Sequence, residues 1–107
     1  MNRGDLVTAT LPGAFGKPRP ALIIQADAFD HLASITVLPL TTFVLDAPSF
    51  RITVEPSARN GLREPSQVMI DKAHTLHRQK VGYVIGRLAE ADMLAVNRAL
   101  ALFFGLA

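Results

Sequence analysis

The sequence predicts a mainly β domain with one C-terminal helix, folded as a small, strongly bent antiparallel barrel. Three observations predict this class: several short β-branched or alternating segments, Gly- and Pro-rich turns between them, and helical periodicity after residue 89. The chain has 107 residues and half of them are apolar, which is enough to bury one core. We therefore expect a single domain over residues 1–107.

The expected strands follow one another closely. They cover residues 5–10, 21–25, 35–42, 50–55 and 66–71, and a last one lies in VGYVIGRL. ALIIQ at 21–25 is apolar on both faces, which is typical of a central strand. FRITVE at 50–55 alternates apolar and polar residues, so Arg51, Thr53 and Glu55 should lie on a solvent-exposed face. Pro39 cannot donate to a ladder, so its strand should be bulged or at an edge there. Residues 26–34 should form a loop or one helical turn.

Apolar residues recur at helical spacing from Glu90 onward, and Gly105 suits the position just after a helix. The apolar stripe is expected to belong mostly to the core, with part of it available to a dimer. It consists of Leu94, Val96, Leu100, Phe103 and Phe104.

Composition limits the possible environments and sites. The chain has no cysteine, so disulfides and thiolate metal sites are excluded. It has no apolar run near the roughly 20 residues of a membrane span, and no hydrophobic signal segment. We expect a cytoplasmic protein with no membrane association. The histidines at 31, 74 and 77 lack the spacing of a ligand set, so neither a metal nor a cofactor is expected. The net charge of +2 permits an anionic partner without requiring one.

The stretch KPRP at 17–20 is the first candidate site. Lys17 and Arg19 both precede prolines, which favours extended backbone and places the two side chains on one side. A guanidinium fixed in this way can donate to two phosphate oxygens at once. The alternative is an ordinary solvated strand entry in which the prolines prevent edge pairing.

The ends of two later strands supply further candidates. Thr41 and Thr42 close VLPLTT, where a hydroxyl could turn toward a ligand or simply favour a strand. Asp71 closes SQVMID and could cap the next turn, act as a general base or orient Arg19.

Four stretches in order resemble the MazF/PemK family of type II toxins. They are RGDLV at 3–7, KPRPALIIQADAF at 17–29, VLPLTT at 37–42 and PSQVMIDKAHTLHRQKVGYVIGRL at 65–88, and the pattern at 88–100 is also similar. The resemblance implies an SH3-like, CcdB/MazF-like antiparallel barrel and a homodimer. It also implies metal-independent, sequence-specific cleavage of single-stranded RNA to 2′,3′-cyclic phosphate and 5′-hydroxyl ends, and a cognate antitoxin with a disordered acidic segment.

The resemblance also assigns candidate roles. Arg19 falls on the family's transition-state clamp, and Thr41 on the threonine that holds a non-bridging phosphate oxygen. Asp71 is our first choice for the general base and His77 the second. The candidate RNA-binding residues are Lys17, Thr42, Phe15, Lys72 and His77. Phe43 could also stack on a base, unless it and Phe15 are core residues, and Arg51, Arg78 and Lys80 could extend the basic floor.

Two departures from the family keep rival functions open. The first loop is short, and Met69 stands where some members have arginine. One rival is a gyrase-poisoning toxin of the CcdB type, which would inhibit gyrase without cutting RNA. The other is a catalytically silent barrel that binds RNA or protein and leaves the RNA intact. A shared fold does not choose among these functions.

Overall fold

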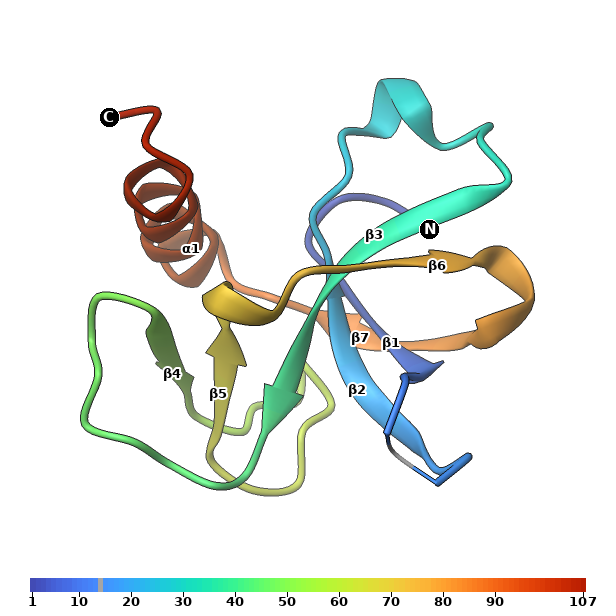
Figure 1. The fold of residues 1–107 in the computed structure, drawn as a ribbon. Coiled ribbons are helices and arrows are strands. Elements are labelled where there is room, and N and C mark those ends of the chain that lie inside the picture. The colour runs from blue at the N-terminus through green and yellow to red at the C-terminus, as the bar shows by residue number, and fades with distance from the viewer. Residues whose placement is uncertain (14) are drawn as a thin grey trace.

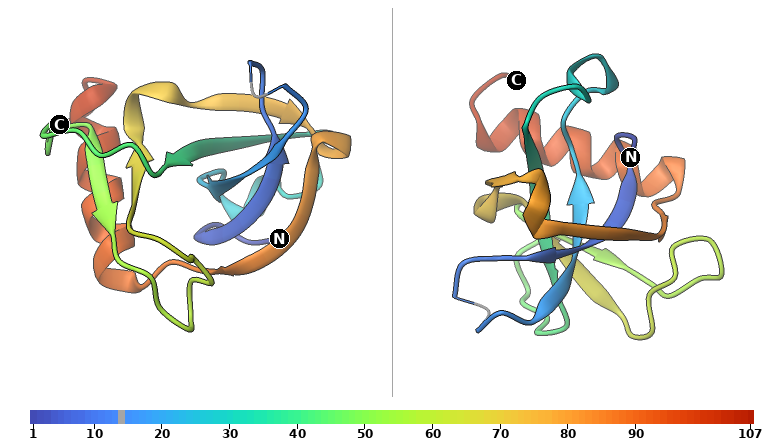
Figure 2. Two further views of the ribbon diagram at one scale, coloured as in Figure 1. Left: turned by 90° about the horizontal axis from the view of Figure 1, so that it is seen from below. Right: turned by 90° about the vertical axis from the view of Figure 1, so that its right-hand side faces the viewer.

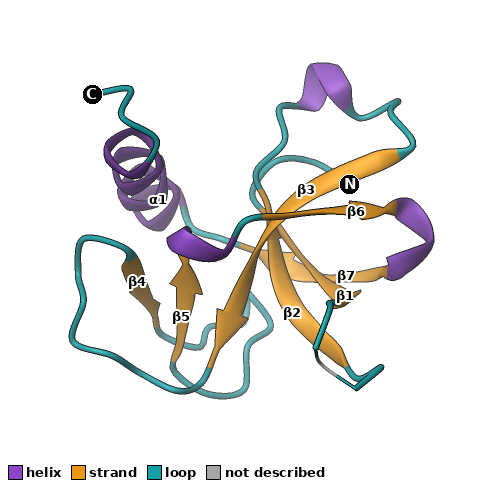
Figure 3. Cartoon of the chain, in the orientation of Figure 1, coloured by secondary structure: helices purple, strands orange, loops and turns teal. Residues whose placement is uncertain are grey.

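The computed structural model describes residues 1–13 and 15–107. Its strands are β1 (Asp5–Thr10), β2 (Pro18–Ile23), β3 (Ser34–Thr41), β4 (Arg51–Val54), β5 (Ser66–Met69), β6 (His74–His77) and β7 (Val81–Arg87). One helix, α1 (Glu90–Phe103), ends the chain (Figures 1 and 3). Three single turns of 3₁₀-helix are η1 (Asp27–Phe29), η2 (Ile70–Lys72) and η3 (Arg78–Lys80). The predicted class, mainly β with a C-terminal helix, is confirmed.

The strands form one bent, antiparallel sheet in the order β4-β5-β3-β2-β1-β7, and β6 pairs with the first half of β3. The segment β7-β1-β2-β3-β6 curls until its end strands are joined through η3 (Figure 2). No ladder joins β6 to β7 or β4 to β7 within the described residues. The expectation of a strongly bent antiparallel barrel is therefore confirmed, and the sheet of this barrel is not closed.

The connection from β4 to β5 lies against β7, which explains why β4 and β7 do not pair. The Arg87 N–H of β7 donates to the Arg59 carbonyl of this connection over 2.9 Å. A Cβ at Gly86 would overlap the Asn60 backbone, so only glycine allows the connection to lie this close. A folded turn thus takes the edge that barrel closure would need.

Strand β3 exchanges its partner halfway along. Its first half pairs with β6 through Val37↔His74, and its end pairs with β5 through Leu40↔Val68. Between these two ladders lies η2. The register with β2 runs through Ala21↔Pro39 without a shift, so the expected bulge is absent. The edge expected at Pro39 exists on one side only, at the fork between β5 and β6.

Two apolar clusters fill the two halves of the fold. One lies inside the curled strands and includes Val7, Ile23 and Val37. The other packs α1 against the sheet through Val96 and Ala99. No helix of the described residues is long and apolar enough to cross a membrane.

The prediction of α1 is confirmed, including Gly105 with φ +73° just beyond its last turn. The prediction that its stripe is mostly core is wrong. Leu94, Phe103 and Phe104 are each at least half exposed, at 51%, 50% and 56%. Only Val96 of the predicted stripe is buried, because β4 and η2 cover one side of the helix.

Candidate functional site

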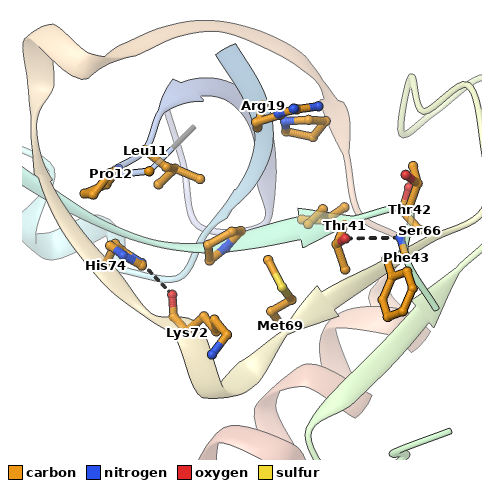
Figure 4. Close-up of a pocket in the computed structure, with 14 residues that line it drawn as sticks. Leu11, Pro12, Arg19, Thr41, Thr42, Phe43, Ser66, Met69, Lys72 and His74 are labelled. Atoms are coloured by element: carbon orange, nitrogen blue, oxygen red, sulfur yellow. Dashed lines mark hydrogen bonds between the residues drawn. The ribbon is translucent and has the colours of Figure 1, made fainter. Parts of the chain in front are cut away.

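A pocket of about 510 Å³ opens at the fork where β5 and β6 leave β3 (Figure 4). Seven segments contribute to it, because the fork brings β2, β3, the loop after β3 and β5 next to η2, β6 and the first loop. The lining residues are Leu11, Pro12, Gly13, Arg19, Pro20, Pro39, Leu40, Thr41, Thr42, Phe43, Ser66, Met69, Lys72 and His74. Four of the predicted site residues are among them: Arg19, Thr41, Thr42 and Lys72.

Arg19 reaches the pocket from the start of β2. The strand already begins at Pro18, so PRP of the KPRP step is part of the ladder while Lys17 precedes it; the register is Ala9↔Arg19. The side chain is exposed and makes no ion pair within the described part of the chain. Its guanidinium is therefore available to an anionic ligand, while its backbone is fixed by strand pairing and two prolines.

Thr41 ends β3 on the other side of the pocket. Its Oγ1 accepts the N–H of Phe43 over 3.1 Å, which turns the chain sharply after the strand. A hydroxyl has one proton to donate as well as its lone pairs, so this bond leaves the O–H of Thr41 available to a phosphate oxygen. Phe43 is 71% exposed at the rim, so it is not a core residue.

The loop after Thr41 is anchored from beneath by Gln67 of β5. This buried amide accepts the N–H of Leu45 over 3.0 Å and donates to the carbonyl of the same residue over 2.9 Å. Its Nε2 also donates to Thr53 Oγ1 on β4. Paired bonds to the backbone of one residue fix a loop firmly, and they hold the position of Thr42 and Phe43 beside the pocket.

His74 and Lys72 line the side of the pocket formed by η2 and β6. The imidazole Nδ1 of His74 lies 2.7 Å from the Lys72 carbonyl oxygen (Figure 4). Because a carbonyl only accepts, Nδ1 carries the hydrogen and Nε2 of the neutral ring is an acceptor. Met69 borders the same side and contributes an apolar surface there.

Asp71 lies in η2 and not at the end of a strand as expected, and it does not line the pocket. Its carboxylate accepts from Arg51 Nε over 3.1 Å and from Arg51 Nη2 over 3.4 Å, and Lys72 Nζ lies 3.6 Å away. The Arg51 side chain is buried against Asp71, with 8% of its surface exposed. The prediction that it faces water or RNA is wrong. Partial burial raises the pKa of Asp71, but the hydrogen bonds and the charges of Arg51 and Lys72 hold it below its usual value of 3.8.

This geometry does not favour Asp71 as a general base, because its acceptor atoms are already bound and its affinity for a proton is reduced. It does not contact Arg19, which was another possibility. The base role of Asp71 stays a prediction.

The remaining predicted RNA-binding residues lie outside the pocket lining. Lys17 precedes β2, and Phe15 is 97% exposed in the first loop at φ +53°. His77 ends β6, and its Nδ1 accepts the N–H of Gln79 over 3.2 Å. Arg78 is directed away, since it donates to carbonyls of the loop that follows η1. None of these residues lines the pocket.

The comparisons with known proteins identify the family of this chain. The family described as PemK-like, MazF-like toxins of type II toxin–antitoxin systems matches residues 2–104. A protein named "Probable endoribonuclease MazF" from Mycolicibacterium smegmatis is 52% identical over 108 residues, covering 100% of this chain and 99% of that one. Endoribonuclease MazF3 of Mycobacterium tuberculosis is 34% identical and covers 84% of this chain and 85% of its own.

Solved structures give the same relationship. The Mycobacterium tuberculosis toxin MazF-mt6 superposes with a TM-score of 0.83 at 32% identity, covering 96% of this chain and 98% of that one. A mycobacterial endoribonuclease in complex with its cognate antitoxin gives a TM-score of 0.84 at 28% identity and covers 100% and 97%. Sequence and fold agree with these relatives over nearly the whole chain. The chain therefore belongs to the PemK-like, MazF-like family of type II toxin–antitoxin toxins.

Proposed function

We propose that this chain is the toxin of a type II toxin–antitoxin system and acts as a metal-independent, sequence-specific endoribonuclease on single-stranded mRNA. The observation that carries the proposal is the pairing of two available donors, the Arg19 guanidinium and the Thr41 hydroxyl, in one pocket. The relatives named endoribonucleases support the same activity.

The reaction uses a nucleophile that RNA itself carries. The 2′-hydroxyl attacks the adjacent phosphorus, the bond to the 5′-oxygen breaks, and the products are a 2′,3′-cyclic phosphate and a 5′-hydroxyl end. The planar fork of Arg19 stabilises the charge that grows on the phosphorane oxygens. Thr41 Oγ1 accepts the Phe43 N–H through a lone pair, so its hydroxyl hydrogen is left to donate to one non-bridging phosphate oxygen. Neither role requires a metal.

RNA outside the reacting phosphate would be held by the residues around the pocket. Phe43 and Phe15 are exposed enough to stack on splayed bases. Thr42, Lys72, Lys17 and His77 offer polar and cationic contacts to the strand. Since mRNA is the substrate, the proposed place of action is the cytoplasm.

The proposed partners are a cognate antitoxin and a second copy of this chain. One structural relative was solved with its cognate antitoxin, and a basic pocket suits an acidic segment of such a protein. The exposed apolar face of α1, with Leu94, Phe103 and Phe104, supports a homodimer. Sedimentation equilibrium checks the dimer, and Phe104→Asp should shift it toward monomer.

The activity is tested with a long mixed-sequence RNA incubated with the protein in EDTA. Cuts at one short motif with 5′-hydroxyl ends are expected, and Arg19→Ala should lose about 10²-fold or more in rate. Arg19→Lys should also be poor, because a point charge cannot replace the bidentate fork. Full activity of Arg19→Ala would refute the role of Arg19 as the transition-state clamp. Intact RNA with the wild type would refute the proposal, and gyrase inhibition would then identify the CcdB-type alternative.

A further inference from the structure

Among the described lining residues, His74 carries the one imidazole, and the family roles above leave it unassigned. We propose that His74 is the general base that takes the proton from the attacking 2′-hydroxyl, through its Nε2. This inference rests on the proposed ribonuclease function. It assigns the one step of that reaction for which Arg19 and Thr41 have no suitable group.

The first argument is the protonation state that the structure imposes on the ring. Nδ1 donates to the Lys72 carbonyl over 2.7 Å, so in the neutral imidazole Nε2 carries a lone pair and no hydrogen. The ring is half-buried where β6 leaves the fork, and the residue pairs with Val37 of β3. Both the tautomer and the position of the base are thus fixed before RNA binds.

The second argument is the chemistry of the other lining residues. The charged groups that share the pocket with His74 are Arg19 from β2 and Lys72 from η2, and both are cations. The lining residues of β3 and β5 carry no titratable group, and no described lining residue has a carboxylate. Guanidinium stays protonated at any working pH, so it cannot accept the proton. The imidazole is the lining group suited to this task.

The third argument concerns the two groups predicted earlier as bases. The Asp71 carboxylate lies outside the lining and is held by Arg51, with its pKa below the usual value. His77 also lies outside the lining, and its Nδ1 is occupied by the Gln79 N–H. Because it lines the pocket and its Nε2 is an acceptor, His74 is better placed than either.

The proposed step balances without a co-reactant. The 2′-hydroxyl proton moves to Nε2 while the 2′-oxygen forms its bond to phosphorus. The bond from phosphorus to the 5′-oxygen breaks, and that oxygen takes a proton from solvent. The imidazolium then returns its extra proton to water, so the ring is neutral for the next turnover.

The decisive variant is His74→Asn. The Asn side-chain nitrogen occupies the position of imidazole Nδ1, so it can keep the donor bond to the Lys72 carbonyl while removing the titratable atom. His31→Asn is the matched control, because His31 is exposed in a turn and lies outside the pocket. Circular dichroism and urea unfolding compare the folded states. Fluorescence anisotropy with a 2′-deoxy substrate, which cannot be cut, compares binding.

We expect His74→Asn to bind the 2′-deoxy substrate like the wild type and to lose about 10²-fold or more in kcat. The wild-type log kcat/KM should rise with pH across the imidazole range, about pH 5–8, and this acid limb should vanish in the variant. Free imidazole should restore part of the rate of His74→Ala. His31→Asn should behave as the wild type in each assay.

Three results separate this inference from the function on which it rests. An unchanged rate or an unchanged acid limb in His74→Asn, with an active wild type, would overturn the base role alone. An acid limb that disappears in Asp71→Asn instead would assign the base to Asp71. No cleavage by the wild type would overturn the proposed function and the base role with it.

Discussion

Removing Asp71 should destabilise the protein through Arg51 and not through the active pocket. Asp71→Ala leaves the Arg51 guanidinium, which is 8% exposed, without its carboxylate. One of the two lost bonds is 3.1 Å long and the other is a marginal 3.4 Å. Because Asp71 itself is 21% exposed, some solvent can replace it, so we expect a loss of about 2–3 kcal/mol in the free energy of unfolding.

The pH dependence follows from the lowered pKa of Asp71. The folded carboxyl binds a proton less tightly than the unfolded one, so the unfolded chain holds more protons and stability rises with pH in that interval. The contribution is complete above the usual value of 3.8 and is lost as pH falls through the lower folded value. The difference between the wild type and Asp71→Ala should therefore shrink below about pH 4.

Urea unfolding at pH 7 and in acid measures both effects. Lys72→Ala is the control, since Lys72 is 54% exposed and lies 3.6 Å from Asp71; its loss should stay within about 0.5 kcal/mol. The double variant Arg51→Met/Asp71→Ala should recover part of the stability, because no buried charge is left alone. Equal losses for Asp71→Ala and Lys72→Ala, or a difference that does not change in acid, would refute this account.

Three further changes test the fold and the pocket rim. Asn60→Ala removes side-chain bonds to three backbone groups of the turn that lies against β7, so urea unfolding should show a loss of about 1–3 kcal/mol. Gly86→Ala should destabilise more than Gly13→Ala in the same assay, because a Cβ at Gly86 would overlap the backbone while Gly13 has nothing within 4 Å. Phe43→Ala should weaken binding to 2′-deoxy oligonucleotides by about 1–3 kcal/mol in anisotropy titrations without lowering stability, because the ring is exposed.

Local patterns predicted the helix and every strand except β6, because elements such as β1, β3 and α1 depend mainly on spacing along the chain. The same patterns misplaced Arg51, since alternation in β4 assigns it to the wet face. Its actual partner, Asp71, lies 20 residues away and is brought near by the pairing of β4 with β5 and by the η2 turn. Closure of the sheet also depends on residues far apart in the sequence. The strand sequences do not show that the turn around Asn60 lies against β7, where β4 would have to pair to close the barrel.

The site residues also differ in whether local sequence could identify them. The KPRP step and the strand-end threonine are contiguous motifs, so Arg19 and Thr41 could be found from the sequence. His74 gave no such indication, because a lone histidine near a turn is usually solvated. Only the fork in β3 brings it beside the other two, and that fork depends on which strands pair. A histidine two residues after a 3₁₀ turn that interrupts a strand is the nearest local sign.

The fork itself can be traced to prolines. Ile24 N–H donates to the Thr36 carbonyl over 3.2 Å, and hydrogen-bonded and non-bonded pairs alternate along an antiparallel ladder. By this parity the Pro20 and Pro18 nitrogens face the side where β3 would continue along β2, and the Pro39 nitrogen faces the fork. None of these three positions can donate a bond. The β2–β3 ladder accordingly ends at Ala21↔Pro39, and the pocket begins there.

The prolines beside Arg19 therefore have a second effect besides stiffening the backbone: they stop β2 from pairing with the end of β3. Pro20→Ala restores an N–H opposite the Leu40 carbonyl, so the ladder should extend by one bond and narrow the pocket. Hydrogen exchange should show a protected amide at residue 20, and RNA cleavage should fall. Pro56→Ala is the control, because Pro56 is exposed outside any strand and the pocket. A fast-exchanging amide at residue 20 together with full activity would show that Pro20 does not keep the pocket open.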